Sequence, residues 1–230
     1  TGSITIPQGV TRIEENTFFA NRRITSYTIP ASVTYIAQRG LGSGFRLESI
    51  YVDEDNPNYY VENNALIERD SKILLLGTKN TIIPDDVVEI GIAAFHFAAY
   101  AQNAQPLVIP NSVKIINDAA FHVACFPSIS LPDSLIYIGN SAFVGDNTIV
   151  QSDLPQTLTH IGSLAFGNCW FVDGGVSIPE GIDTIASNTF NNSHITSVSI
   201  PITVVSIGEK AFYECDELQS ITCYRSEERR

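Results

Sequence analysis

Apolar residues recur along the chain in a pattern that ends in proline. An Ile-Pro or Leu-Pro pair appears eight times, usually with a second apolar residue two positions before the Ile or Leu. An apolar residue follows three positions after each proline, an Ile six positions after it, and Phe or Leu eleven positions after it. These prolines are Pro7, Pro30, Pro84, Pro110, Pro132, Pro155, Pro179 and Pro201. Their spacing of 22 to 26 residues, with one larger gap, indicates an internal repeat.

Two further units of the pattern lack the proline. Asp53 follows Ile50 and Val52 in the larger gap, and Tyr224 takes the proline place near the C-terminus. The sequence therefore predicts ten short strands, about one per 23 residues. Within one strand Val198 would point inward and Ser199 outward, because successive side chains alternate between the two faces. A single strand cannot bury its apolar side, so we expect the strands to stack in parallel rungs.

The segments between the strands are expected to form short helical turns that carry an Ala-Phe pair inward. A glycine often follows the Ile and would permit a tight turn. The next residue could cap the turn, as at Asp118, Asn140, Ser163 and Ser187. The larger gap contains apolar runs at 65–68 and 73–76 around a polar link, which predict a β-hairpin insertion at about 57–79 in place of one helical turn.

The repeat resembles the BspA-like class of leucine-rich repeats. Its unit stands most fully at Ile200-Pro201, Val204, Ile207-Gly208, Ala211-Phe212, Cys215 and Leu218. The resemblance implies a single right-handed solenoid over residues 1–230, α/β in class and mostly β. It also implies a secreted or cell-surface bacterial protein, some members being adhesins toward host proteins or other bacteria. We therefore expect a non-catalytic module that binds a surface protein or glycan, with a structural spacer as the alternative.

Composition limits the partners. The chain has 230 residues and a formal net charge of −12, so it lacks the basic surface that nucleic acids or anionic membranes require. No apolar run approaches the roughly 20 residues that span a bilayer. The sequence enters the repeat directly after Thr1-Gly2-Ser3, and we expect a signal peptide of the parent protein to have been removed.

Catalytic and metal-binding patterns are missing from the sequence. It contains no GxSxG, HExxH or phosphate-loop motif, so we expect no enzyme activity and no cofactor. His96 and His122 occupy the same column of adjacent repeats, but Val144 follows in the next one, so no third metal ligand stands in register. Cys169 and Cys215 lie two rungs apart, too far for a disulfide, and we expect buried thiols.

The outward strand positions are the candidate partner-binding face. Repeat proteins use their extended sheet surfaces for binding, and part of this row is apolar. The candidates are Tyr51, Ile82, Val108, Ser130, Asp153, Ser177 and Ser199. The alternative explanation is that Thr, Ile and Val simply favour strands.

Two other features are candidates for contact with a partner. Polar residues follow the proline at Asp85, Asn111, Asp133, Gln156 and Glu180, and they serve either solubility or a basic partner. Trp170 and Phe171 occupy a corner that is polar in several repeats. With Val172 in the apolar Leu column, one of the two rings is a candidate exposed anchor, and local core filling is the alternative.

Overall fold

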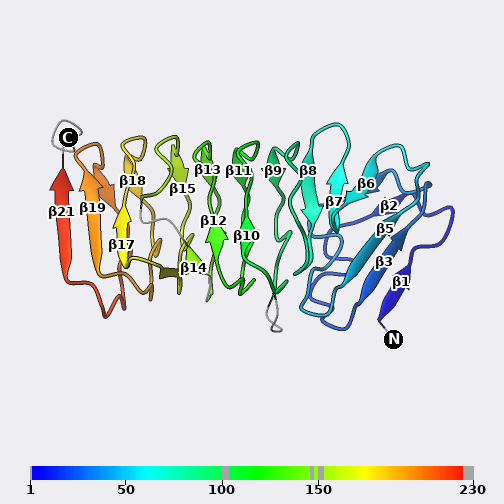
Figure 1. The fold of residues 1–230 in the computed structure, drawn as a ribbon, viewed down its shortest axis with the longest axis horizontal. Coiled ribbons are helices and arrows are strands. Elements are labelled where there is room, and N and C mark those ends of the chain that lie inside the picture. The colour runs from blue at the N-terminus through cyan, green and yellow to red at the C-terminus, as the bar shows by residue number, and fades with distance from the viewer. Residues whose placement is uncertain (1, 100–103, 146–147, 150–152, 225–230) are drawn as a thin grey trace.

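The computed structural model describes residues 2–99, 104–145, 148–149 and 153–224. The chain forms a long stack of short rungs, with the N- and C-terminal ends at opposite ends of the stack (Figure 1). This confirms the predicted solenoid. Every regular element in the described residues is a β-strand.

The Ile-Pro strands pair in parallel on one side of the stack, here called the proline-side sheets. Equivalent positions face each other, as Val176, Val198 and Ile221 do. The strands are β1 (Ser3–Thr5), β3 (Ser26–Ile29) and β5 (Ser49–Val52), then β10 (Leu107–Val108) and β12 (Ile129–Ser130), then β17 (Gly175–Ser177), β19 (Ser197–Pro201) and β21 (Ser220–Tyr224). Two strands that precede no proline, β14 (Thr148–Ile149) and β16 (Trp170–Phe171), continue the sheet of β10 and β12.

The Ile that follows each proline by six residues lies in a strand of the opposite side. These strands are β2 (Arg12–Ile13) and β4 (Tyr35–Ile36), then β9 (Glu89–Ile90), β11 (Ile115–Ile116), β13 (Tyr137–Ile138) and β15 (His160–Ile161), then β18 (Thr184–Ile185) and β20 (Ser206–Ile207). Equivalent residues of neighbouring repeats therefore pair with one another, as Ile90, Ile116, Ile138 and Ile161 do.

One of the ten predicted proline-side strands is not a regular strand. Residues 81–83 are irregular because the Ile82 amide donates a hydrogen bond of 3.3 Å to the carbonyl of Asn63, in the inserted segment. Part of the strand predicted before Pro155 lies outside the described residues. Of the part that is described, Asp153 bridges to Ser177, and β12 pairs with β14. The repeat spacing in the sequence therefore predicts more regular strand pairing than these sheets have.

A column of phenylalanines fills the middle of the core. Neighbouring rings stack with centroids 5.0 to 5.6 Å apart and interplanar angles of at most 10°. The column consists of Phe95, Phe121, Phe143, Phe166, Phe190 and Phe212. All but the last are fully buried, so each internal ring packs on its copies in the rungs above and below.

The expected short helical turns are instead β-turns that bond to the next rung. Residues two before and two after the column Phe have left-handed backbones, as at Ala119 (φ 54°) and Val123 (φ 51°) around Phe121. The Phe121 amide donates to the Ala142 carbonyl of the next rung at 2.7 Å, whereas the His122 amide donates back to Ala119 at 3.0 Å. Alternating bonds of this kind satisfy the backbone without a helix.

The predicted helix caps have a different role. The Asn140 amide donates to Asp118 Oδ1 at 2.7 Å, and the Ser163 amide donates to Asn140 Oδ1 at 2.9 Å, so these side chains link rungs. Gly139 has no left-handed backbone, but a Cβ there would lie 2.5 Å from the Asp118 amide nitrogen. Glycine is therefore required by the close approach of two rungs rather than by a tight turn.

The insertion lies within the predicted bounds of about 57–79 and contains the predicted hairpin, to which one further strand is added, so that it forms a three-stranded meander. Its strands are β6 (Tyr59–Glu62), β7 (Ala65–Glu68) and β8 (Ile73–Leu76). Asn63 and Asn64 both have positive φ, 48° and 60°, which is the backbone of a type I′ hairpin turn. Strand β8 then pairs in parallel with β9, so the meander joins the sheet opposite the proline side.

Strand β7 separates two hydrophobic cores. Ala65 and Ile67 belong to the large core of the long stack, whereas Leu66, between them, belongs to a smaller core around β1–β5. All three are fully buried, because the alternating faces of one strand both meet packed side chains. The rungs built by β1, β3 and β5 are tilted relative to the later ones (Figure 1).

Candidate binding surface

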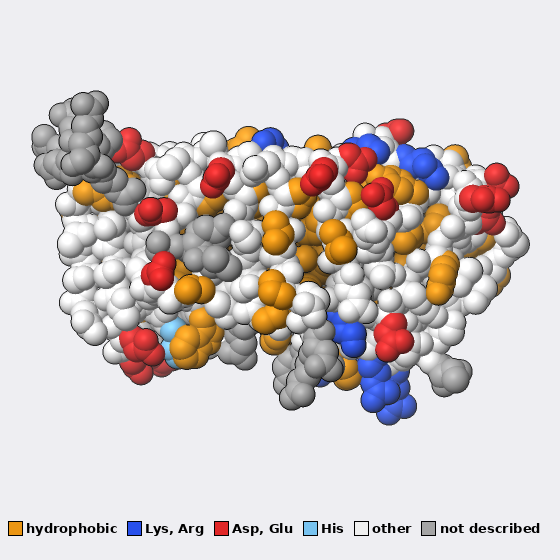
Figure 2. Space-filling model, in the orientation of Figure 1, with side chains coloured by type: hydrophobic (Ala, Val, Ile, Leu, Met, Phe, Trp, Pro, Cys, Tyr) orange, Lys and Arg blue, Asp and Glu red, His pale blue; other side chains and the backbone are white. Residues whose placement is uncertain are grey.

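The apolar candidates of the proline-side face are exposed. Tyr51 is 59% accessible, Ile82 69% and Val108 66%, whereas the inward neighbours Ile50, Ile83 and Leu107 are buried. Alternation along each segment explains this contrast. Hydrophobic side chains are spread along the middle of this face, and acidic ones lie along its upper edge and also at its lower edge (Figure 2).

The polar candidates differ in exposure. Asp153 is exposed and Ser130 and Ser199 are half-buried, so these three side chains reach the surface. Ser177 is only 6% accessible, so its predicted outward exposure is wrong. Ser177 pairs with Ser199 on one side and bridges to Asp153 on the other, so it lies between two neighbouring rungs.

A hollow lies over the first three rungs of the proline-side face, and sequence analysis did not identify it. It has a volume of about 330 Å³. Its lining comes from β1, β3 and β5 and the residues that follow them: Thr5, Ile6, Pro7, Gln8, Thr28, Ile29, Pro30, Tyr51, Val52 and Asp53. The outward row of the repeat could have indicated the hydroxyls, but the hollow itself depends on how the three rungs are packed.

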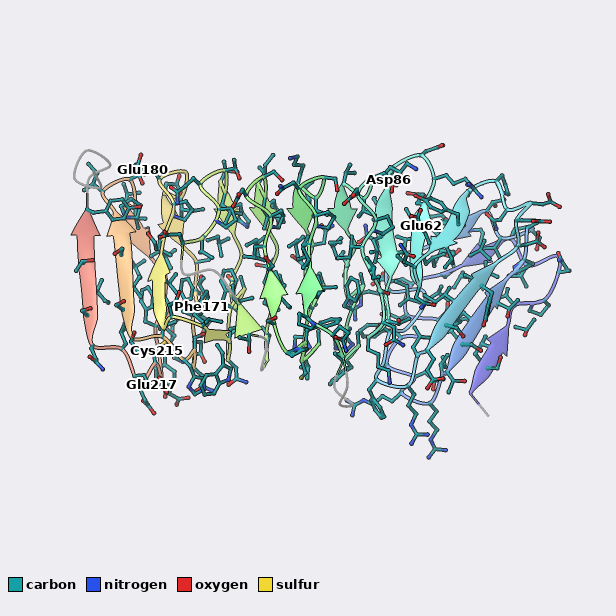
Figure 3. All side chains as sticks on the ribbon, viewed as in Figure 1. Glu62, Asp86, Phe171, Glu180, Cys215 and Glu217 are labelled. Atoms are coloured by element: carbon teal, nitrogen blue, oxygen red, sulfur yellow. The ribbon has the colours of Figure 1, made fainter. Side chains whose placement is uncertain are left out.

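The polar row that follows the prolines is exposed throughout the described repeats. Its members are Asp85, Asn111, Asp133, Gln156 and Glu180. Glu180 lies at the upper margin of the stack in Figure 3. The row borders the apolar positions of the face on one side and gives that margin a negative charge.

The predicted aromatic corner is partly correct. Trp170 is 45% exposed, but Phe171 is buried and packs edge-on against Phe166 with centroids 5.6 Å apart. Val172 is 60% exposed, so Phe171 and not Val172 fills the apolar column. Phe171 follows Ile149 in this column because β14 and β16 pair in register.

Trp170 is part of a stack of side chains from three rungs. Its ring lies parallel to that of His194, with centroids 3.6 Å apart, and His194 Nδ1 is 3.1 Å from Glu217 Oε1. Glu217 projects from the lower edge of the stack, on the side opposite Glu180 (Figure 3). The spacing of these residues matches the repeat, which could have revealed the stack from the sequence.

The two in-register histidines join the tilted rungs to the long stack. The ring centroid of His96 lies 5.1 Å from that of His122 and 5.0 Å from that of Phe19, on which the His96 ring stacks. The guanidinium group of Arg39 lies over the Phe19 ring. Burial, followed by the charges of His122, Arg39 and Arg22, lowers the pKa of His96 to about 4. Among the described residues no three His, Cys, Asp or Glu side chains are grouped to hold a metal ion.

The four cysteines are thiols and none of them forms a disulfide. Cys169 is buried and its thiol donates to the Phe143 carbonyl at 2.9 Å, while the thiol of Cys215 donates to the Phe190 carbonyl at the same distance. These are repeated backbone contacts of one column, consistent with small buried side chains. Cys125 is partly buried, and Cys223 is exposed on β21.

Solved structures share this fold. A leucine-rich repeat protein from Eubacterium ventriosum has a TM-score of 0.64 at 21% identity, covering 92% of this chain and 64% of that one. A leucine rich cell surface protein from Faecalibacterium prausnitzii has a TM-score of 0.61 at 22% identity, covering 96% and 59%. The pneumococcal vaccine antigen PcpA has 0.61 at 16% identity, covering 97% and 57%. The chain thus spans less than two thirds of each relative.

Sequence comparison identifies the repeat itself. Comparison with curated proteins finds no match for the chain. The family model of the BspA type leucine rich repeat region matches residues 1–70, 76–173 and 152–228, in six copies. These matches cover nearly the whole sequence. The chain therefore belongs to the BspA-type leucine-rich repeat family.

Proposed function

We propose that this chain is an adhesin-like, non-catalytic binding module of a secreted or cell-surface bacterial protein. The observation that carries the proposal is the strong exposure of three apolar side chains on the proline-side face, those of Tyr51, Ile82 and Val108. Exposed apolar groups bordered by polar residues are typical of protein interaction sites. Membership of the repeat family and likeness to a bacterial cell-surface protein support the location.

The partner that we propose is a host or bacterial surface protein or a glycan. The net charge of −12 disfavours nucleic acid and anionic membranes. No helix among the described residues has the length and apolarity to cross a bilayer. A scaffold of repeated rungs leaves specificity to its exposed side chains, so these residues and not the fold select the partner.

A structural spacer is the second candidate. The stack is extended, and its two chain ends lie at opposite ends (Figure 1). Such a rod could hold another domain away from a cell surface without binding anything through its sheet face. The two functions differ in whether exposed side chains of that face matter.

The test is binding to an array of extracellular-matrix proteins and glycans, with a double variant Ile82→Glu, Val108→Glu beside the wild type. A matched control is Val88→Glu, Ile136→Glu, since both residues are exposed, 40% and 43%, and precede β9 and β13 on the other side. We expect binding to the matrix proteins of the array to be lost only in the first variant. Protein binding that survives in it would contradict the proposal, and an array without any bound protein or glycan would favour the spacer.

A further inference from the structure

We propose that the hollow over β1, β3 and β5 is a binding groove for a neutral carbohydrate chain that crosses the three strands. This inference rests on the proposed function and names a ligand class for one part of the proline-side face. The hollow holds about 330 Å³, near the lower end of the usual range for ligand pockets. It would take a short stretch of a longer chain rather than a large ligand.

Three hydroxyl groups form a row in this groove. Thr5 pairs with Thr28, and Thr28 pairs with Tyr51, so their side chains stand side by side on neighbouring rungs about 4.8 Å apart. All three residues are exposed. A row of hydroxyls that crosses the strands at this spacing suits a ligand whose own hydroxyls repeat along an extended chain.

These hydroxyls are free to bind a ligand. Among the described residues, no intramolecular hydrogen bond engages the side chains of Thr5, Thr28 or Tyr51. The equivalent row at the other end of the stack differs, because Ser199 Oγ and Thr222 Oγ1 lie 3.1 Å apart and satisfy each other. The neighbouring column of the first rungs is also paired, since Ser26 donates to Ser3 at 2.9 Å.

The rest of the lining fits a sugar better than a charged ligand. Tyr51, 59% exposed, offers a ring on which the apolar face of a pyranose can stack, and Pro7 and Pro30 supply apolar contact. Gln8 adds an amide that can donate and accept. Asp53 is the sole charged residue of the lining, so phosphate, sulfate and acidic sugars would meet repulsion.

The third rung holds this lining in place. Asn56, buried behind it, donates to the carbonyls of Pro30 and Val33 at 2.9 and 3.0 Å. The Asp53 amide donates to the Ile29 carbonyl at 2.9 Å. The groove is therefore formed by rigid elements before any ligand arrives, which lowers the entropic cost of binding.

The experiment is calorimetric titration of the full chain with cellohexaose, xylohexaose, mannohexaose and maltohexaose, with a heparin hexasaccharide as the charged comparison. We expect at least one neutral probe to bind and the heparin probe not to bind. Tyr51→Ala should weaken that binding about tenfold and Thr28→Val about threefold, by removing the stacking ring and one hydroxyl. Neither variant should alter the thermal midpoint by more than about 2 °C, because both side chains are exposed.

Two matched controls remove the same groups elsewhere. Tyr35→Ala removes an exposed ring from β4, and Thr222→Val removes a hydroxyl already bonded to Ser199. Both should bind like the wild type. The proposal is overturned if no neutral probe binds, if Tyr51→Ala binds normally, or if hexalysine competes for the groove and the sugars do not.

The outcome is separable from that of the proposed function. The Ile82→Glu, Val108→Glu variant leaves every residue of the groove unchanged, so it should still bind the oligosaccharide. Loss of array binding in that variant without any oligosaccharide binding in the wild type would defeat only the groove. Oligosaccharide binding alongside unaltered binding of the array proteins in the variant would defeat only the role proposed for Ile82 and Val108.

Discussion

The long stack and the tilted first rungs solve the same packing problem in different ways. In the long stack successive rungs add similar residues to the core columns, and six phenylalanines stack with nearly parallel planes. In the first rungs the corresponding places hold Phe18, half-buried, and Leu41. Buried tyrosines with particular hydrogen-bond partners occur there instead.

These tyrosines make the smaller core specific. The Tyr27 hydroxyl donates to the Gly42 carbonyl at 3.2 Å and accepts from the Gly42 amide at 3.1 Å, and burial raises its pKa to about 12. The Tyr59 hydroxyl accepts the Ile36 amide at 2.8 Å. The register of the long stack thus comes from repeated apolar packing. The smaller core depends instead on individual buried hydrogen bonds, each of which occurs once.

The largest effect should come from the middle of the phenylalanine column. Phe143→Ala removes a fully buried ring that stacks on Phe121 and Phe166, and we expect a loss of about 3–5 kcal/mol in the free energy of unfolding. Phe212→Ala should cost clearly less, because that ring is half-buried and has a stacked neighbour only in Phe190 among the described residues. Urea unfolding measures both, and equal losses would contradict the column model.

Adjacent substitutions in β7 should separate the two cores. Leu66→Ala and Ile67→Ala each remove a fully buried side chain and should each cost about 2–5 kcal/mol. The single tryptophan, Trp170, is exposed and adjoins Phe171, which belongs to the large core, so we expect its fluorescence to report on that core. We expect Ile67→Ala to shift the fluorescence transition in urea, and Leu66→Ala to shift mainly the far-ultraviolet circular dichroism. Identical shifts of both signals in both variants would show that the cores unfold as one.

Tyr27→Phe should have an intermediate effect. It leaves the Gly42 amide and carbonyl without their buried partner, which typically costs about 1–3 kcal/mol. Tyr51→Phe is the control, because its hydroxyl is exposed and has no intramolecular partner among the described residues. Thermal unfolding followed by circular dichroism distinguishes them, and a Tyr27→Phe midpoint equal to that of the control would refute the role of this contact.

Acidification should destabilise the contact between the two cores, and we expect this to be the smallest of the four predicted effects on stability. The folded pKa of His96, about 4, lies below the unfolded value of 6.5, so the native state favours the neutral ring. Stability from this group is complete above pH 6.5 and declines as the pH falls toward 4. His122, whose pKa is also lowered by burial, acts in the same direction. His96→Phe should flatten the decline, and an unchanged pH profile of the unfolding midpoint would contradict it.

The repeat columns allowed much of the long stack to be predicted, because each column is a direct record of one packed position. Ile90, Ile116 and Ile138 recur at one spacing and pair with one another. Exposure of Tyr51, Ile82 and Val108 followed from alternation along the strand. These predictions needed only the period of the sequence and the geometry of a strand.

The predictions that were wrong concern features that depend on contacts between rungs. The left-handed residues around Phe121 and the inter-rung bonds of Asp118 are not encoded in local helix signals, so β-turns were mistaken for helical ones. The irregular segment at Ile82 arises from its bond to Asn63, which depends on the meander. The hollow beside Tyr51 required three rungs to be placed together, and no column of the repeat describes such a volume.

The most direct test of the two-core arrangement is native-state hydrogen exchange with increasing urea. The arrangement predicts that amides of β3 and β5 exchange through one opening and those of β11, β13 and β19 through another of different free energy, with β7 protected in both. Two separate openings would support the role of the meander as a shared wall. A single opening that carries all of these amides together would contradict it and show that the chain has one cooperative core.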